Sequence, residues 1–308
     1  MSKIQPIPPP SPPSPRVWTS LDLINWTKEF FAKKGIESPR LEAELLLAEV
    51  LGVPRIRLYV DFEKPVAPEK LATFREYVKR RGDNREPLQY ILGCADFIGL
   101  RLKLTPAVLI PRPETELLAV WGAERLAEAA RPEAPAPAAL DLCTGSGCLA
   151  LYLASKQAAA HVHATDISAP ALDVARENAK TLQLDARVTF HAGDLFAALP
   201  AELRGAFDLL VANPPYIDPA LRATLAPEVR EHEPAGALFA GEQGLKLVRQ
   251  IVAEAPAWLK PGAWLGVEFG MGQADAVKKF AEAAPAYAAL EIRNDSAKLP
   301  RMLLARKG

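Results

Sequence analysis

The chain has 308 residues, 49% of them hydrophobic, which is enough to bury a substantial core and to form about two domains. Lys plus Arg and Asp plus Glu both number 37, and this balance excludes the whole-molecule positive field that drives sequence-independent nucleic-acid binding. Three cysteines without a CxxC pair, and the lack of an apolar run of about 18 residues, argue against a zinc framework and a membrane span. We therefore expect a cytoplasmic protein with no membrane contact, no metal ion and no stable nucleic-acid binding.

The N-terminal region divides into a tail and a helical domain. Residues 1–16 hold a proline cluster that favours extended, solvated chain, so we expect a disordered tail, with a PxxP-type docking segment as the alternative. Thr19 and Asp22 then form a capping-box pattern, and apolar periodicity predicts helices over residues 19–35, 38–52 and 69–81. Residues 17–86 should therefore form a small helical domain. Its third helix is basic, which indicates either a partner surface or a solvated face.

A linker and an α/β domain follow. Short β-like runs between residues 88 and 110, broken by glycine and proline, predict a β-hairpin, so residues 87–112 should link the helical domain to a second domain over 113–308. A helix opens within residues 110–116. From there strands and helices alternate, which predicts a parallel sheet, and two closing strands predict a terminal hairpin with an antiparallel strand. The expected strands lie at residues 140–142, 161–165, 188–191, 207–212, 263–269, 289–292 and 302–305.

A glycine-rich turn follows the first of these strands, with the sequence Asp141-Leu142-Cys143-Thr144-Gly145-Ser146-Gly147. Glycines let the backbone approach a ligand, and the helix N-terminus beyond them favours polar or anionic groups. With Ala150 the turn also satisfies the dinucleotide fingerprint G-x-G-x-x-A, so it predicts a nucleoside cofactor without separating nicotinamide from adenosylmethionine.

Acidic residues follow the next two strands. Asp166 ends the second strand, where a carboxylate can accept both ribose hydroxyls of either cofactor; an acid favoured by the dipole of the following helix is the alternative. Gly193, Asp194 and Leu195 follow the third strand and could hold an adenine ring, although Gly-Asp is also an ordinary turn pair. His161 and His163 point to one side of a strand, but two ligands without a third are weak support for a metal site.

The segment Asn213-Pro214-Pro215-Tyr216 directly follows the apolar strand at 207–212. Its two prolines keep the chain extended, so the Asn213 amide oxygen and a neighbouring backbone carbonyl can both face a cleft as acceptors. Such a pair suits a planar –NH2 group. An amide nitrogen is difficult to methylate because its lone pair is delocalised, and two acceptors would orient it and favour the charge that develops during attack, while Tyr216 stacks on the planar group. A simple turn after a strand is the alternative.

These residues resemble the class I adenosylmethionine-dependent methyltransferases, and within them the PrmC/HemK family of protein glutamine methyltransferases. The likeness spans nearly the whole chain after residue 17. Besides Asn213-Pro214-Pro215-Tyr216, it rests on residues 85–93 (REPLQYILG), 109–116 (LIPRPETE) and 227–230 (PEVR) with Glu233-Pro234.

The resemblance implies an α/β fold, with a seven-stranded Rossmann-like methyltransferase sheet and a small N-terminal helical domain that recognises the substrate. It implies a monomeric enzyme that transfers a methyl group from S-adenosylmethionine to the side-chain amide nitrogen (N5) of the glutamine in the Gly-Gly-Gln motif of peptide chain release factors. The implied cofactor contacts are Cys143, Thr144, Gly145, Ser146, Gly147, Asp166, Asp194, Leu195 and Asn213. The implied glutamine pocket is Asn213, Pro214, Pro215 and Tyr216, of which Asn213, Pro214 and Tyr216 are catalytic.

Departures from the family pattern leave alternatives open. Leu195 stands where an aromatic residue is frequent, which should affect adenine packing. The run from Cys143 to Cys148 is similar to the sister group that methylates a ribosomal-protein glutamine, whereas residues 111–116 are similar to the release-factor group. An N6-adenine nucleic-acid methyltransferase would use the same Asn-Pro-Pro-Tyr segment on a flipped base. A nicotinamide oxidoreductase would leave that segment without a role, and a non-catalytic module would need damage at Asp166 or Asn213, which are both present.

Overall fold

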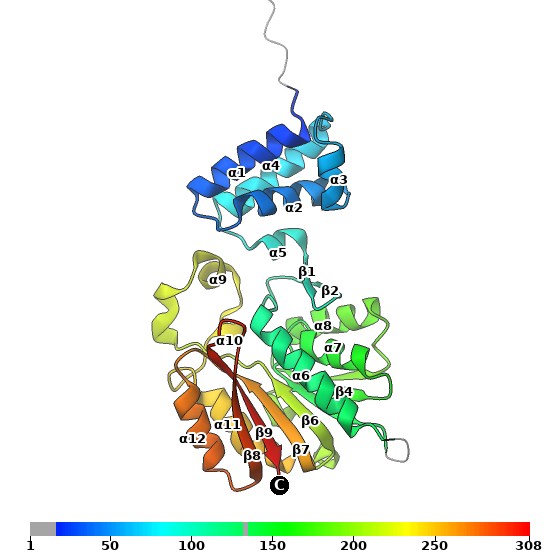
Figure 1. The fold of residues 1–308 in the computed structure, drawn as a ribbon, viewed down its shortest axis with the longest axis vertical. Helices are drawn as coiled ribbons and strands as arrows, with labels where there is room; N and C mark the ends of the chain where they lie inside the picture. The colour runs from blue at the N-terminus through cyan, green and yellow to red at the C-terminus, as the bar shows by residue number, and fades with distance from the viewer. Residues whose placement is uncertain (1–16, 132–134) are drawn as a thin grey trace, which may run out of the picture. The chain divides into compact units, whose positions relative to one another are not determined.

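The computed structural model describes residues 17–131 and 135–308. It divides the chain into two compact units, with the boundary between Ile91 and Leu92, inside the predicted linker (Figure 1). The expected disordered tail at 1–16 lies outside the described residues, and the predicted domain boundaries stay predictions. In the described part of the chain, no helix combines the length and the apolar character that a bilayer crossing requires.

The first unit is helical, as expected. Thr19 and Asp22 form the predicted capping box, and Gly52 ends the second helix in the left-handed conformation. Residues 88–92, which the sequence suggested as β-like, are instead helical, because the Pro87 carbonyl accepts from the backbone N–H groups of Tyr90 and Ile91 and so closes a helical turn. The helices are α1 (Ser20–Lys33), α2 (Pro39–Leu51), α3 (Arg55–Val60), α4 (Pro68–Gly82) and α5 (Leu88–Leu92).

The basic residues of α4 are used largely within this unit. Arg81 is only 6% exposed and forms an ion pair with Glu42 of α2. Arg80 donates two hydrogen bonds to the Glu86 carboxylate. Two of the cations that suggested a partner surface therefore have an internal structural role.

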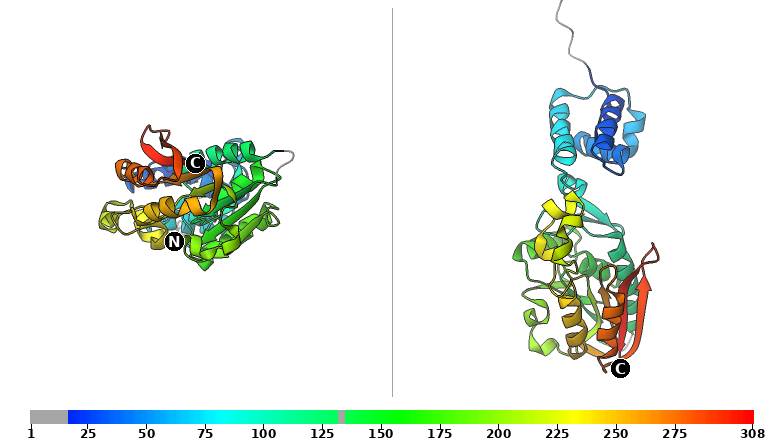
Figure 2. Two further views of the ribbon diagram at one scale, coloured as in Figure 1. Left: turned by 90° about the horizontal axis from the view of Figure 1, so that it is seen from below. Right: turned by 90° about the vertical axis from the view of Figure 1, so that its left-hand side faces the viewer.

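The second unit opens with the expected hairpin, β1 (Cys94–Phe97) and β2 (Leu100–Lys103), and with helix α6 (Pro113–Ala129). A seven-stranded sheet follows, in the order β5-β4-β3-β6-β7-β9-β8. Strand β9 runs antiparallel to both of its neighbours, so the predicted reversed hairpin is confirmed (Figure 2). The strands are β3 (Ala138–Leu142), β4 (His161–Asp166), β5 (Val188–Ala192), β6 (Phe207–Ala212), β7 (Leu259–Glu268), β8 (Tyr287–Asn294) and β9 (Pro300–Lys307).

Helices cover both faces of this sheet (Figure 1). Side chains alternate along β6, so Leu209 and Val211 pack in the core with α6, while Leu210 and Ala212 face the opposite core. This burial on both faces explains why the strand sequences are continuously apolar. The remaining helices are α7 (Cys148–Lys156), α8 (Ala169–Thr181), α9 (Pro227–His232), α10 (Ala235–Leu238), α11 (Lys246–Glu254) and α12 (Ala274–Glu282), with short 3₁₀ turns η1 (Leu195–Ala198), η2 (Ala201–Leu203), η3 (Pro219–Thr224) and η4 (Ala255–Ala257).

Candidate active site

A pocket of about 560 Å³ lies at the carboxyl ends of the parallel strands in the second unit. The sheet register places these ends side by side, because Leu142 of β3 pairs with both Thr165 of β4 and Ala212 of β6. The residues that follow each strand therefore converge on one cavity. Its lining includes Cys143, Thr144, Gly145, Ser146, Asp166, Asp194, Leu195, Asn213 and Pro215, all predicted as site residues. The predicted residues Gly147, Pro214 and Tyr216 lie outside this lining.

The glycine-rich turn after β3 is held from beneath by Asp141. One carboxylate oxygen, Oδ2, accepts from the Thr144 hydroxyl at 2.6 Å and from the Ala150 N–H at 3.1 Å. The other oxygen, Oδ1, is buried and has no hydrogen-bond partner among the described residues. Burial raises the pKa of the Asp141 carboxyl to about 7. At Gly145, φ is +55° and an added Cβ would meet no described atom within 4 Å, so this glycine leaves room on the pocket side.

Asp166 lies where a ribose-binding carboxylate is expected. Its oxygens accept from the backbone N–H of Gly145 at 2.8 Å and from that of Ser168 at 2.9 Å. Burial raises the pKa of Asp166, while these backbone hydrogen bonds act in the opposite direction. Each oxygen retains a lone pair for a further donor. Asp166 thus couples the glycine-rich turn to the end of β4.

Leu195 follows Asp194 on the pocket wall beyond β5. Its φ of +45° is unusual for a branched residue, and its side chain is buried in the core shared with Phe196 and Trp258. Gly193 has φ of +150°, and a Cβ there would lie 3.0 Å from Ala198. The loop is therefore fixed by packing, and Leu195 offers this wall an aliphatic surface in place of an aromatic one.

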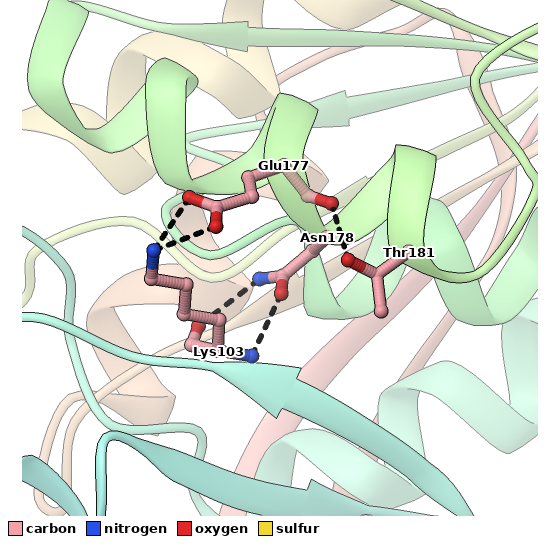
Figure 3. Close-up of polar contacts among 4 residues, drawn as sticks. All are labelled: Lys103, Glu177, Asn178 and Thr181. Atoms are coloured by element: carbon pink, nitrogen blue, oxygen red, sulfur yellow. Dashed lines mark hydrogen bonds and ion pairs between the residues drawn. The ribbon is translucent and has the colours of Figure 1, made fainter.

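Asn178 of α8 connects the glycine-rich turn to the hairpin, and sequence reasoning missed it; Figure 3 shows its contacts with Lys103 of the hairpin. Its amide accepts from the Lys103 N–H at 2.7 Å and donates to the Lys103 carbonyl at 3.1 Å and the Ser146 carbonyl at 3.0 Å. The Lys103 ammonium also pairs with Glu177. The available signal was a polar residue on the apolar stripe of a helix, since Asn178 is only 2% exposed.

Asn213 belongs to a buried hydrogen-bond network that the sequence did not reveal. Its Nδ2 lies 2.9 Å from the Thr115 hydroxyl, and that hydroxyl lies 2.8 Å from Oε2 of Glu268. The Tyr216 hydroxyl donates to Oε1 of the same carboxylate at 3.0 Å. Burial raises the pKa of Glu268 to about 7 and also raises the pKa of Tyr216, which therefore stays protonated.

Two other segments singled out from the sequence meet beside the pocket. The Glu233 carboxylate accepts from the Ile110 N–H and forms an ion pair with Arg112, so residues 109–116 and the segment ending at Pro234 are joined. Ala107, Val108, Leu109 and Pro111 line one side of the pocket, and Pro234, Gly236 and Ala237 also belong to its lining.

Three of the four histidines lie on β4 and β5 and the fourth, His232, ends α9; all four are outside the pocket lining. His163 and His191 stack at a ring separation of 5.2 Å and share a hydrogen bond of 2.9 Å, while His161 contacts the Thr189 hydroxyl. Burial lowers the pKa of His163 to about 4 and also lowers that of His191. Across residues 17–131 and 135–308, no group of three or more His, Cys, Asp or Glu residues is arranged to hold a metal ion.

Comparison with known proteins agrees with this geometry. Residues 22–93 match the PrmC N-terminal domain, and residues 121–228 match the methyltransferase small domain. The release factor glutamine methyltransferase of Geobacter sulfurreducens is 46% identical over 263 residues, which are 85% of this chain and 88% of that protein. The one from Chlorobaculum tepidum is 42% identical over 292 residues, or 94% and 98%. The chain belongs to the family of release factor glutamine methyltransferases.

The family assignment covers both units, since the likeness to these release factor glutamine methyltransferases spans most of the chain. Among solved structures, the catalytic domain of hMettl16 in complex with the MAT2A 3′UTR hairpin 6 has a TM-score of 0.52 at 14% identity, over 79% of this chain and 84% of that one. This likeness concerns the fold alone. The predicted fold, a seven-stranded α/β methyltransferase sheet with a helical N-terminal region, is confirmed.

Proposed function

We propose that this protein transfers a methyl group from S-adenosylmethionine to the side-chain amide nitrogen of a glutamine in a peptide chain release factor. One observation carries the proposal: Asn213, at the start of the Asn-Pro-Pro-Tyr segment, lines the same pocket as the glycine-rich turn and Asp166. A site for a nucleoside cofactor and an acceptor for a planar –NH2 group therefore adjoin. The names of the relatives support the release factor as substrate, in preference to a ribosomal protein or an adenine base.

The residues present fit S-adenosylmethionine. Gly145 leaves space on the pocket side, Asp166 can accept ribose hydroxyls, and the pocket wall at Leu195 is an aliphatic surface on which an adenine face can pack. Asp141 carries a buried carboxylate oxygen without a partner beneath the loop, and the negative charge that it gains above about pH 7 is favourable near a cationic cofactor. When bound, adenosylmethionine supplies an electrophilic methyl group on a sulfonium.

The protein's own part is to orient the glutamine amide. The Asn213 Nδ2 is directed to Thr115, so Oδ1 is available to accept from the substrate –NH2. An acceptor on that N–H favours the partial positive charge that the nitrogen gains as the new C–N bond forms at the expense of the C–S bond, and the methylated nitrogen then releases one proton to water. Positioning of this kind can supply much of the rate without a strong base.

The helical unit is the part that we assign to substrate recognition, because the pocket is built entirely from residues 107–247. We propose a monomeric, cytoplasmic enzyme, in agreement with the translational role of the substrate. Ala107, Val108 and Leu109, which line the pocket, follow shortly after the hairpin in the sequence.

A labelling experiment tests this function. The purified full-length protein is incubated with adenosylmethionine that carries a labelled methyl group, and it is offered a release factor, its Gly-Gly-Gln glutamine-to-alanine variant, ribosomal proteins and DNA. We expect label on the intact release factor alone. Label on a ribosomal protein or on DNA would retain methyl transfer and overturn the substrate.

A further inference from the structure

Glu268 is a buried carboxylate that takes no direct part in the methyl transfer proposed above. It ends β7, its side chain is 0% exposed, and it does not line the pocket. A buried carboxylate is costly unless it is hydrogen-bonded, and here both oxygens are used. Oε2 accepts from Thr115 of α6, and Oε1 accepts from Tyr216, in the segment after β6. One carboxylate therefore joins three elements around the amide-binding segment.

The hydrogens in this network have one consistent arrangement when Glu268 is ionised. A carboxylate only accepts, so the single hydrogen of the Thr115 hydroxyl must be donated to it. The hydroxyl oxygen can then only accept from Asn213. This forces the –NH2 group of Asn213 toward Thr115 and leaves Oδ1 on the other side of the amide.

We propose that Glu268 is a positioning residue for methyl transfer, which acts through the Thr115 hydroxyl to hold the Asn213 amide with its oxygen toward the substrate and which anchors Tyr216 with its second oxygen. This inference rests on the proposed function, because it assumes that the Asn213 oxygen accepts from the glutamine –NH2. It adds the reason why that oxygen, and not the nitrogen, faces the substrate.

Tyr216 is held at two points, which supports the same role. Its hydroxyl donates to Glu268, and its backbone carbonyl accepts from Gln273 Nε2 at 2.9 Å. Gly244 packs against this carbonyl so closely that a Cβ would lie 2.0 Å from the oxygen. The segment after Asn213 is thus fixed from both sides, as pre-organised transition-state contacts require.

Protonation of Glu268 would reverse the arrangement. A proton on Oε2 donates to the Thr115 hydroxyl, which then turns its own hydrogen to Asn213 and favours the flipped amide. Burial raises the pKa of Glu268 to about 7; Glu114 of α6 acts in the same direction, while Arg301 of β9 and the hydrogen bonds from Thr115 and Tyr216 oppose it. Cys148 also interacts electrostatically with Glu268, and Arg112 does so with Tyr216. Turnover should therefore rise as the pH increases through about 7.

A pair of variants at Thr115 isolates the relay. Thr115→Val has nearly the same volume but no hydroxyl, whereas Thr115→Ser keeps it. We expect kcat for the release factor to fall about 10- to 100-fold in Thr115→Val, with the Kd for adenosylmethionine changed less than threefold, as the loss of an oriented acceptor predicts. Thr115→Ser should restore most of this turnover. Equal kcat values in the two variants would overturn the relay.

Glu268→Gln and Tyr216→Phe complete the test. In Glu268→Gln, kcat should fall and its inflection near pH 7 should disappear. Asp141→Asn should retain the inflection, because Asp141 also titrates near this pH but lies outside the network. Tyr216→Phe removes the donor to Oε1 of Glu268 and leaves the Thr115 contact on Oε2 in place. If the wild-type protein labels no release factor, the proposed function fails; if it does and Glu268→Gln keeps both its kcat and the inflection, only this inference fails.

Discussion

Asn213 lines the pocket, and the Thr115 hydroxyl orients its side-chain amide. We expect Asn213→Ala to retain adenosylmethionine binding within about fivefold, whereas kcat for the release factor falls on the order of 100-fold or more, as the loss of a transition-state hydrogen bond gives. Calorimetric titration and labelled-methyl turnover measure the two effects. Asn294→Ala is the matched control, because Asn294 is exposed at the end of β8. Near-normal turnover of Asn213→Ala would contradict the mechanism.

Substitution of Asp166 should weaken adenosylmethionine binding more than it lowers kcat, the reverse of the effect expected at Asn213. Asp166→Asn replaces one acceptor oxygen by an –NH2 group that faces the backbone N–H of Gly145 or Ser168, which already donate to this side chain. We expect the Kd for adenosylmethionine to rise about 10- to 100-fold, since a charged acceptor contributes about 1.5–3 kcal/mol, with kcat at saturation less affected. Calorimetry on the wild-type protein and the variant decides this. A Kd within twofold of wild type would show that Asp166 has only a structural role.

Asn178 joins α8 to the β1–β2 hairpin. It is therefore the most informative position at which to measure how contacts between elements contribute to stability. Asn178→Leu would leave the Lys103 N–H, the Lys103 carbonyl and the Ser146 carbonyl without their partner. We expect the free energy of unfolding to fall by about 2–4 kcal/mol, since each buried hydrogen bond contributes about 1 kcal/mol and an unsatisfied group costs more. Urea denaturation of the full-length chain measures this.

The neighbouring ion pair supplies the control for that experiment. Glu177→Gln removes the partner of the Lys103 ammonium, but both side chains are about half exposed. An exposed pair contributes between about 0 and 1 kcal/mol, so this variant should unfold almost as the wild type does. Equal losses in Asn178→Leu and Glu177→Gln would contradict the role of the buried amide.

The buried carboxyl of Asp141 makes the stability of the whole molecule depend on pH. The pKa of Asp141 rises from 3.8 to about 7 on folding because of burial. The folded chain therefore holds this proton more tightly, and the contribution of Asp141 to stability falls as the pH rises from about 4 to 7, at a cost of roughly 4 kcal/mol above that window. His163 acts in the opposite direction, because folding lowers its pKa from 6.5 to about 4. Its contribution to stability therefore rises as the pH increases between these two values.

The variant Asp141→Asn separates these effects, because His163 is common to both proteins. The amide keeps an acceptor for Thr144 and Ala150 but carries no charge. We expect its Tm to exceed that of wild type at pH 8 and to lose this advantage at pH 5, in thermal scans of the two proteins side by side. A Tm difference that does not change with pH would show that Asp141 is not ionised by pH 8.

Local patterns predicted much of this protein. The capping box at Thr19, the glycine turn after β3 and the alternation of apolar strands with helices are short-range features, because caps, turns and burial periodicity depend on neighbouring residues. The Asn-Pro-Pro-Tyr segment and Asp166 were assigned to one site from their places after strands, and the structure brings Asn213 and Asp166 to one pocket. The helix at 88–92 was missed because its single turn is closed by Pro87 rather than by periodicity.

Tertiary structure alone decided which side chains hold the site residues in place. Thr115 and Glu268 lie 153 positions apart, and Asn213 lies 98 positions from Thr115, so no local pattern links them. Parallel strands bring their carboxyl ends together whatever the length of chain between them, which is why the sequence could place Asn213 at the pocket. The orientation of its amide depends on hydrogen bonds between residues distant in the chain, and those exist only after the sheet and α6 have packed.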